Sequence, residues 1–349
     1  MSEPNPDFPR DPGGPRIEDR SEAAQARALI ESQGLRFEPD WDDLVVLREG
    51  GRVVACAARA GYVLKMVTIA PDHQGGDLLG ELVTRLVESA RAAGHETVFV
   101  FTAPANAPSF QALNFRLLAV RGEAALLEHG PGLEAYLAVH AAEIRPGANG
   151  AVVVNGNPFT RGHLHLVEQA ARAVDRLYLF VVREDRSLFP FPVRFRLARE
   201  ATAHLANVTV LDTSRYAVSA ATFPSYFLKR LDQAATAQMG VDLELFASRL
   251  APRFHIVRRF AGAEPLDPTT AAYNRMMGEI LPAHGIQWTE LPRLEADGRP
   301  ISATRIRAAF RDGDLDAVAG LLPATTLAFL RSPEAAPIAV RLRAGKENP

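Results

Sequence analysis

The stretch AVVVNGNPFTRGH, residues 151–163, decides the fold of the second half of this chain. Its first four residues form a short, wholly apolar run, which is typical of a strand buried in a parallel sheet. From Gly162 onward the sequence becomes helical, because apolar residues recur on one face: Leu166, Val167, Ala170, Ala171 and Val174. A doubly wound α/β fold places an anion-binding turn between its first strand and the following helix. We therefore expect such a turn at residues 155–163.

The same alternation continues along the chain. Further apolar runs at 177–182, 208–211 and 255–260 predict buried strands, with helical stretches between them. Alternating strands and helices predict a doubly wound parallel sheet, which binds ligands at the carboxyl ends of its strands. The second half of the chain is therefore expected to be one such α/β domain.

The first half is predicted to form a separate α/β unit. Strand-like runs at 44–47, 53–58, 62–69 and 98–101 accompany a helix whose apolar stripe runs from Leu78 to Ala90. The predicted organisation is a disordered leader at 1–22, a first domain at 23–142, a linker at 143–150, a second domain at 151–333 and a tail at 334–349.

The composition of the chain excludes several classes of protein. Its 349 residues carry a formal net charge of −2, whereas general nucleic-acid binders usually carry a basic excess. No apolar run is long enough to span a bilayer, and the proline-rich N-terminus lacks the apolar core of a signal peptide. Cys56 is the only cysteine, which favours a reducing compartment. We therefore expect a cytoplasmic protein that binds neither nucleic acid nor membranes.

The chemistry of the first turn depends on four of its residues. Pro158 fixes the backbone of the turn, and Gly162 lets a ligand approach the backbone closely. His163 lies at the predicted helix N-terminus, which favours anions, and Thr160 lies three residues earlier on the same face. A hydroxyl and an imidazole placed there can stabilise charge on a transferring phosphoryl group. The alternative is that Thr160 only caps the helix and that His163 has a structural role. His165, two residues further on, is interpreted as structural.

A second motif, ISATRIR at 301–307, precedes a predicted helix near the C-terminus. Ser302 is a good N-cap for that helix, and Thr304 and Arg307 occupy its first turns. An arginine near a helix N-terminus opposes the helix dipole, and a bound polyphosphate would offset this because guanidinium groups bind phosphate oxygens in pairs. The alternative is a solvated basic helix face.

The two motifs together resemble the T/H-x-G-H and I-S-x-T-x-x-R signatures of the nucleotidyltransferase superfamily, here about 140 residues apart. The region between them resembles the catalytic domain of citrate lyase ligases. Three segments carry this resemblance: VREDRSLFP at 182–190, ATFPSYF at 221–227, and FAGAEP at 260–265 with Tyr273 and Asn274. The resemblance covers the chain from about residue 150 to about residue 330.

The first half of the chain resembles the acetyltransferase-like (GNAT) domain that citrate lyase ligases carry in front of the catalytic domain. VTIAPDHQGGDLL at 67–79 resembles the GNAT loop and helix that cradle the pyrophosphate of coenzyme A. A later GNAT signature is resembled by Asn106, Phe110 and Phe115. Asp77 and Asn114 stand where this pattern usually has glycine, and a carboxylate at a phosphate loop repels the ligand. We therefore expect this domain to dock a coenzyme-A-like arm or its carrier protein, not to use acetyl-CoA.

The resemblance implies a reaction in two steps. ATP and acetate would give acetyl adenylate and pyrophosphate, and the acetyl group would then pass to a thiol. That thiol belongs to the phosphoribosyl-dephospho-coenzyme A group on the citrate lyase acyl carrier subunit. Mg²⁺ would neutralise the phosphates, held mostly by phosphate oxygens and water, so that no residue is expected to be a metal ligand.

The resemblance also implies roles for individual residues. His163 and Thr160 would be catalytic. The residues expected to bind ATP are Asn157, Pro158, Phe159, Gly162, Gly262, Glu264, Ser302, Thr304 and Arg307. The residues expected to bind the acid, a phosphate or the carrier arm are Arg183, Gln74, Gly75 and Gly76. For Glu264 and Arg183 a solvated surface position is the alternative.

Three other functions are compatible with parts of this pattern. Both motifs would also suit an adenylyltransferase that acts on a phosphorylated small molecule such as phosphopantetheine. A GNAT-type acetyltransferase with an accessory nucleotide-binding domain is a second alternative, against which Asp77 argues. A non-enzymatic nucleotide sensor is the third, and the full polar set in both motifs argues against it.

Overall fold

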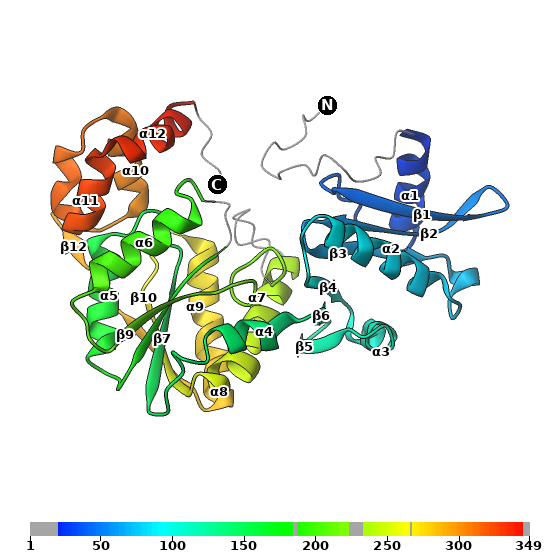
Figure 1. Ribbon diagram of the computed structural model, residues 1–349, viewed down its shortest axis with the longest axis horizontal. Helices are drawn as coiled ribbons and strands as arrows, with labels where there is room; N and C mark the ends of the chain where they lie inside the picture. Colours follow the sequence, from blue (N-terminus) through cyan, green and yellow to red (C-terminus); the bar gives the residue numbers. More distant parts are fainter. Residues whose placement is uncertain (1–19, 184–186, 223–232, 266, 345–349) are drawn as a thin grey trace. The chain divides into compact units, whose positions relative to one another are not determined.

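The structure is a computed structural model that describes residues 20–183, 187–222, 233–265 and 267–344. The chain divides into two compact units, one up to residue 136 and the other from residue 137. Each unit has its own sheet and core, and each is described here by itself. Figure 1 shows the two units and the element labels used below.

The first unit is built on a six-stranded mixed sheet with the order β1-β2-β3-β4-β6-β5. Only β3 and β4 are parallel neighbours, and their pairing in the described residues is confined to Val63 with Phe99 and Leu64 with Val100. The two strands therefore separate toward their carboxyl ends. The strands are β1 (Asp43–Glu49), β2 (Arg52–Ala60), β3 (Val63–Ile69), β4 (Val98–Thr102), β5 (Arg116–Arg121) and β6 (Ala124–His129).

Helices cover both faces of this first sheet. On one face α1 (Arg20–Ser32) buries Ala26 and Ile30 against Cys56 and Met66. The other face is covered by α2 (Leu78–Ala92) and α3 (Ala107–Gln111), and the apolar stripe of α2 packs on β2, β3, β4 and β6. Helix α4 (Gly132–Val139) begins in this unit and runs across the boundary at residue 136. Two short 3₁₀ turns, η1 (Pro71–His73) and η2 (Pro104–Asn106), precede α2 and α3.

The second unit contains the doubly wound parallel sheet that the sequence predicts. Its five strands are all parallel, in the order β11-β10-β7-β8-β9. The chain therefore winds outward in one direction from β7 through β8 and β9, and in the other direction through β10 and β11. The strands are β7 (Asn149–Val154), β8 (Leu177–Val181), β9 (Val208–Asp212), β10 (Ile256–Gly262) and β11 (Gln287–Leu291). A two-stranded ribbon, β12 (Glu295–Ala296) and β13 (Arg299–Pro300), follows.

Helices also cover both faces of the second sheet. On one face α5 (Arg161–Ala171) and α6 (Phe191–Thr202) share a core with Val152, Val154 and Leu179. On the other face the rings of Tyr178 and Phe180 lie 5.1 and 5.5 Å from that of Phe254. The helical elements near this second face are α7 (Gln233–Leu245), the π-helical turn η4 (Phe246–Leu250), α8 (Ala251–Arg253), α9 (Pro268–Ile280) and η5 (Leu281–His284).

The helices α10 (Ala303–Asp312), α11 (Ala324–Arg331) and α12 (Ala336–Arg343) gather at one end of the second unit, with η6 (Asp316–Leu321) and η7 (Pro333–Ala335) between them (Figure 1). This arrangement corrects the predicted tail at 334–349. Ile338, Ala339 and Leu342 are buried in the same core as α5 and α6, so residues 336–343 belong to the folded unit. Their apolar spacing matches one helical face, and that burial offsets the ordering of a short helix.

Two other boundaries differ from those predicted. Strand β7 begins at Asn149, inside the predicted linker, because the buried Asn149 side chain donates to the carbonyls of Arg145 and Phe254. Helix α1 begins at Arg20, inside the predicted leader, and Glu22 there pairs with Arg48 at 3.4 Å. The rest of the leader lies outside the described residues. In the described part of the chain, no helix combines the length and apolar character needed to cross a membrane.

Candidate active site

A cavity of about 290 Å³ lies at the carboxyl ends of β7 and β10. The sheet order changes direction between these two strands, and in open α/β sheets ligands bind in the crevice at such a point. Residues of both strands line the cavity, together with the first turn of α5 and one side of α9. Five of the sequence-predicted site residues line it: Thr160, Gly162, His163, Gly262 and Glu264.

Thr160 and His163 form a capping box at the start of α5. The backbone N–H of Thr160 donates to Nδ1 of His163 at 3.0 Å, and the backbone N–H of His163 donates to the Thr160 hydroxyl at 3.3 Å. Because Nδ1 accepts a hydrogen bond, the proton of the neutral ring lies on Nε2. The ring also stacks on Phe159, with centroids 5.3 Å apart. These contacts fix His163 as an Nε2–H donor at a helix N-terminus.

The surroundings of His163 keep its ring neutral. Burial, and after it the positive charge of Arg293, lower the pKa of His163 to about 4. At neutral pH the ring is therefore a neutral imidazole that donates a hydrogen bond and is not a charged imidazolium. Such a donor, oriented before the substrate binds, suits charge that develops on a phosphate.

The shifted pKa predicts a pH-dependent stability. The folded state favours neutral His163, so its contribution is full above the unfolded pKa of about 6.5 and is lost as pH falls toward about 4. We expect the free energy of unfolding in urea to fall less steeply between pH 6.5 and 4 for His163→Asn than for the unchanged protein. His165→Asn, on the same helix, should retain the steeper fall. Equal pH dependence in the unchanged protein and His163→Asn would contradict the assignment.

The second motif lies against the first. Gly162 lies beside Ile301: a Cβ added at the glycine would be 3.6 Å from the Ile301 side chain, an ordinary van der Waals contact. Ser302 caps α10 by accepting from the N–H of Thr304 at 3.2 Å. The Arg307 guanidinium donates to the carbonyl of Asn157 at 2.9 Å and to the Thr304 hydroxyl at 3.1 Å. The structure therefore brings the two motifs together.

Six of the predicted ATP-binding residues occupy supporting positions. Phe159 is fully buried under His163, and Pro158 follows a cis peptide bond with Asn157. The side-chain oxygen of Asn157 accepts from the N–H of Phe189 at 3.0 Å. These three residues, with Ser302, Thr304 and Arg307, are not among those that line the cavity. Their contacts shape the backbone around it.

The β10 side of the cavity is formed by Gly262 and Glu264. The Gly262 carbonyl accepts from Nδ2 of Asn274 at 3.0 Å, and an added Cβ would meet only Arg293 Cγ, at 4.0 Å. Glu264 accepts from Arg293 at 3.3 Å and from the N–H of Asp267 at 3.2 Å. The Glu264 carboxylate is thus a partly buried member of the cavity wall, and the solvated alternative does not describe its position.

Arg183 lies away from the cavity lining. More than half of its side chain is exposed, and Nη1 is 3.4 Å from Oδ2 of Asp212. Its guanidinium lies over the ring of Phe191, 5.0 Å from the centroid. Its predicted role in binding the acid, a phosphate or the carrier arm stays a prediction.

Gln74, Gly75 and Gly76 belong to the first unit, in the exposed loop between β3 and α2. Gly75 has a φ of +84°, which glycine adopts without strain, and Gln74 Nε2 donates to the carbonyl of Ile69 at 3.4 Å. Asp77 precedes α2 without a side-chain cap, so the first amides of this helix are not occupied by it. This geometry suits an anion, apart from the charge of Asp77.

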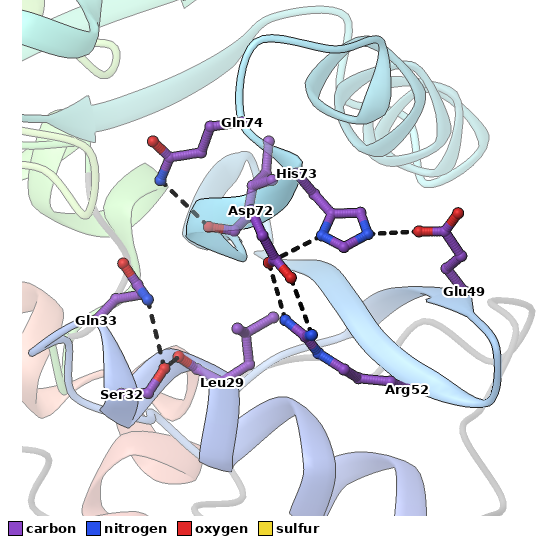
Figure 2. A network of polar contacts seen from close by, with 9 residues as sticks. Leu29, Ser32, Gln33, Glu49, Arg52, Asp72, His73 and Gln74 are labelled. Atoms are coloured by element: carbon purple, nitrogen blue, oxygen red, sulfur yellow. Dashed lines mark hydrogen bonds and ion pairs between the residues drawn. The ribbon is translucent and has the colours of Figure 1, made fainter.

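A network of charged side chains anchors the start of this loop to the β1–β2 hairpin. Figure 2 shows both Asp72 oxygens facing Arg52 and the His73 ring between Asp72 and Glu49. The guanidinium nitrogens of Arg52 donate to the two Asp72 oxygens at 2.9 and 3.0 Å. Arg52, and after it His73, lower the pKa of Asp72 to about 2, while hydrogen bonds to Asp72 and Glu49 raise the pKa of His73. Because the network is exposed, it contributes little to the free energy of unfolding, and its main effect is to position the loop.

Sequence reasoning missed a buried network that holds the first turn in place. Arg194 of α6 is fully buried and donates to the carbonyls of Phe189, Asn155 and Val182 at 2.8, 2.9 and 2.6 Å. It also donates to Oδ1 of Asn155 at 3.0 Å. One side chain thus connects the ends of β7 and β8 with the segment before α6.

A second missed group lies where β10 and α9 line the cavity, with Asp242 of α7 behind them. Arg259, Asp242 and Tyr273 are all buried, and the Tyr273 hydroxyl donates to Oδ2 of Asp242 at 2.5 Å. Burial raises the pKa of Tyr273 well above its usual value, so the phenol stays protonated as a donor. An arginine inside an otherwise apolar strand is the signal that could have revealed this group.

Comparison with known proteins adds direct relatives to this geometry. The sequence profile of the citrate lyase ligase C-terminal domain matches residues 149–330. The citrate (pro-3S)-lyase ligase of Klebsiella pneumoniae is 39% identical over 321 residues, covering 90% of this chain and 94% of that protein. The chain belongs to the citrate lyase ligase family. It is therefore an enzyme of the ligase class.

A second relative gives the same result. The citrate (pro-3S)-lyase ligase of Escherichia coli K12 is 33% identical over 325 residues, covering 91% of this chain and 92% of that protein. Among solved structures, a bifunctional NMN adenylyltransferase/ADP ribose pyrophosphatase from Francisella tularensis aligns with 58% of this chain and 54% of its own, at 13% identity and a TM-score of 0.37. At that score the structural similarity adds nothing to the family assignment.

Proposed function

We propose that this ligase activates acetate with ATP and transfers the acetyl group to the thiol of the prosthetic group on the citrate lyase acyl carrier subunit, in the cytoplasm. The observation that carries the proposal is the His163–Thr160 capping box at the switch point of the sheet, with the N-terminus of α10 beside it. Membership of the citrate lyase ligase family indicates that the enzyme it activates is citrate lyase.

In the first step a carboxylate oxygen of acetate forms a bond to the α-phosphorus of ATP. The bond to the bridging oxygen breaks, and pyrophosphate leaves with the electron pair. His163 supports this step because its neutral ring donates from Nε2–H to the phosphate. The backbone N–H of Thr160, which donates to Nδ1, holds the ring in that tautomer. In the second step the thiol sulfur attacks the acetyl carbon, AMP leaves, and a thioester remains.

The negative charge of the triphosphate requires partners. The N-termini of α5 and α10 offer amides, and Arg307 and Arg293 lie beside them. In the described residues, no cluster of three or more histidine, cysteine, aspartate or glutamate side chains could hold a metal ion. Magnesium would therefore be held by phosphate oxygens and water, where it neutralises charge.

Arg307 offers a sharp test of the phosphate site. Its planar guanidinium donates to the carbonyl of Asn157 and to the Thr304 hydroxyl, and we propose that it binds the β and γ phosphates of ATP. Arg307→Lys should raise KM for ATP by a factor on the order of ten, because an ammonium group cannot reproduce the fork. Arg305→Lys is the matched control, because Arg305 is an exposed arginine two residues earlier on the same helix. Unchanged ATP kinetics in Arg307→Lys would remove this role.

We propose that the first unit docks the coenzyme-A-like arm or its carrier and is not an acetyl-CoA-dependent transferase. Gly75 and the free amides of α2 support anion binding, while the carboxylate of Asp77 stands beside them. A flexible arm held there would be delivered to the ligase site of the second unit.

The experiment that tests the proposed function uses thiol-form citrate lyase as acceptor. With the ligase, ATP, magnesium and acetate, the lyase should become acetylated and gain citrate-cleaving activity, with one AMP released per acetyl group. With acetyl-CoA in place of ATP and acetate, no acetylation is expected. Efficient acetylation from acetyl-CoA would overturn the assignment and make the first unit the transferase.

A further inference from the structure

Arg259 is a buried cation in the wall of the cavity. Only 2% of the residue is exposed, and it lies in the middle of β10, between Arg258 and Phe260. Phe260 turns toward the core under α5, so by strand alternation Arg259 turns toward the opposite face. There its guanidinium lies 4.0 Å from the ring centroid of Phe246 and 6.0 Å from that of Tyr273.

The charge of Arg259 is not matched by a direct ion pair. Arg259 shares a hydrogen bond with Tyr273 and acts electrostatically on Asp242. Oδ1 of Asp242, however, accepts from the N–H of Val218 at 2.7 Å, and Oδ2 accepts from Tyr273 at 2.5 Å. No ion pair within 4.0 Å joins Arg259 to a carboxylate in the part of the chain that the structure describes. Within those same residues, the buried Nη1 of Arg259 has no hydrogen-bond partner. A buried guanidinium N–H in this state favours an incoming anion.

The cavity beside Arg259 also has an apolar side. Val153, Val218 and Met277 line the same cavity. Val153 lies on β7, and because Arg259 pairs with Ala151, alternation places Val153 on the same face of the sheet as Arg259. Among the described residues, the surroundings of the guanidinium therefore combine a buried N–H without a hydrogen-bond partner and apolar side chains. This suits a short carboxylic acid better than a polyphosphate, which carries several charges.

We propose that Arg259 binds the carboxylate of the acid that is activated, with the alkyl group against Val153, Val218 and Met277. The inference rests on the proposed function, because it names the subsite for the acid in that reaction. The planar fork holds both carboxylate oxygens and orients one of them toward the α-phosphorus. The triphosphate lies apart from it, at the N-termini of α5 and α10.

The first test substitutes Arg259 and measures exchange of labelled pyrophosphate into ATP. Arg259→Lys keeps the charge but loses the fork, so KM for acetate should rise at least about tenfold while KM for ATP stays within about twofold. Arg258→Lys is the matched control, because Arg258 is adjacent on β10 and does not line the cavity. It should change neither constant. An unchanged acetate KM, or an ATP KM that rises equally, would overturn the proposal.

The second test keeps Arg259 and changes only the apolar side of the proposed subsite. It therefore tests the subsite even if Arg259→Lys does not fold. Val153→Ala enlarges the alkyl side of the subsite, so kcat/KM for propionate relative to acetate should rise by a factor on the order of ten. An unchanged ratio would place the acid elsewhere. Acetate-dependent exchange in the unchanged protein is established first, so failure of either variant removes the subsite and leaves the ligase function standing.

Discussion

Replacing His163 with alanine should lower kcat by a factor on the order of 10²–10³, the loss that follows removal of one preorganised donor to a developing charge. The structure gives the reason: Nε2–H is the free donor of a ring whose Nδ1 is held by Thr160 and whose face stacks on Phe159. KM for ATP should change much less, because the donor acts mainly in the transition state. The measurement is steady-state acetylation of the lyase.

The matched control for this prediction is His165→Ala, which removes a histidine from the same helix. It should keep kcat within a few-fold of the unchanged protein. Thermal unfolding of both variants separates catalysis from folding. A folded His163→Ala protein with near-normal turnover would contradict the role of His163 in catalysis.

Arg194→Met should cause the largest loss of stability. The substitution removes the donor from the buried carbonyls of Phe189 and Val182 and from the carbonyl and Oδ1 of the half-buried Asn155. Each unsatisfied buried group costs about 1–3 kcal/mol, and a total of at least about 3 kcal/mol is expected. For a unit of this size, that corresponds to a fall in Tm of roughly 6–12 °C.

Arg196→Met is the control for Arg194, two residues further along α6. Arg196 is more than a third exposed, and its ion pair with Glu334 lies on the surface. Such pairs contribute less than about 1 kcal/mol, so Tm should fall by only a few degrees. Equal losses in the two variants would show that the Arg194 network does not hold the first turn together.

Much of the second unit was predictable because its signals are local. Apolar runs mark the central strands, and one helical turn contains both partners of the capping box, Thr160 and His163. The two motifs lie about 140 residues apart in the sequence, and in the structure Arg307 of the second contacts Asn157 of the first. Each of these features depends on residues close in sequence or on a known signature.

The features that sequence reasoning missed depend on long-range contacts. Arg194 and Arg259 are charged, which in an isolated sequence favours exposure, and only tertiary acceptors or aromatic rings explain their burial. Strand β11 (Gln287–Leu291) was missed because it is a half-exposed edge strand with polar residues. The final helix was missed because its apolar face is only three residues long.

The central claim is that a carboxylate attacks the α-phosphorus of ATP, and pyrophosphate exchange tests it most directly. The ligase shares its phosphate motifs with adenylyltransferases that act on phosphorylated molecules, and only the attacking group differs. With magnesium and acetate but no lyase, the enzyme should exchange labelled pyrophosphate into ATP, because acetyl adenylate forms reversibly. Phosphopantetheine in place of acetate should give no exchange. Exchange driven by phosphopantetheine, with none driven by acetate or any other short acid, would contradict the account.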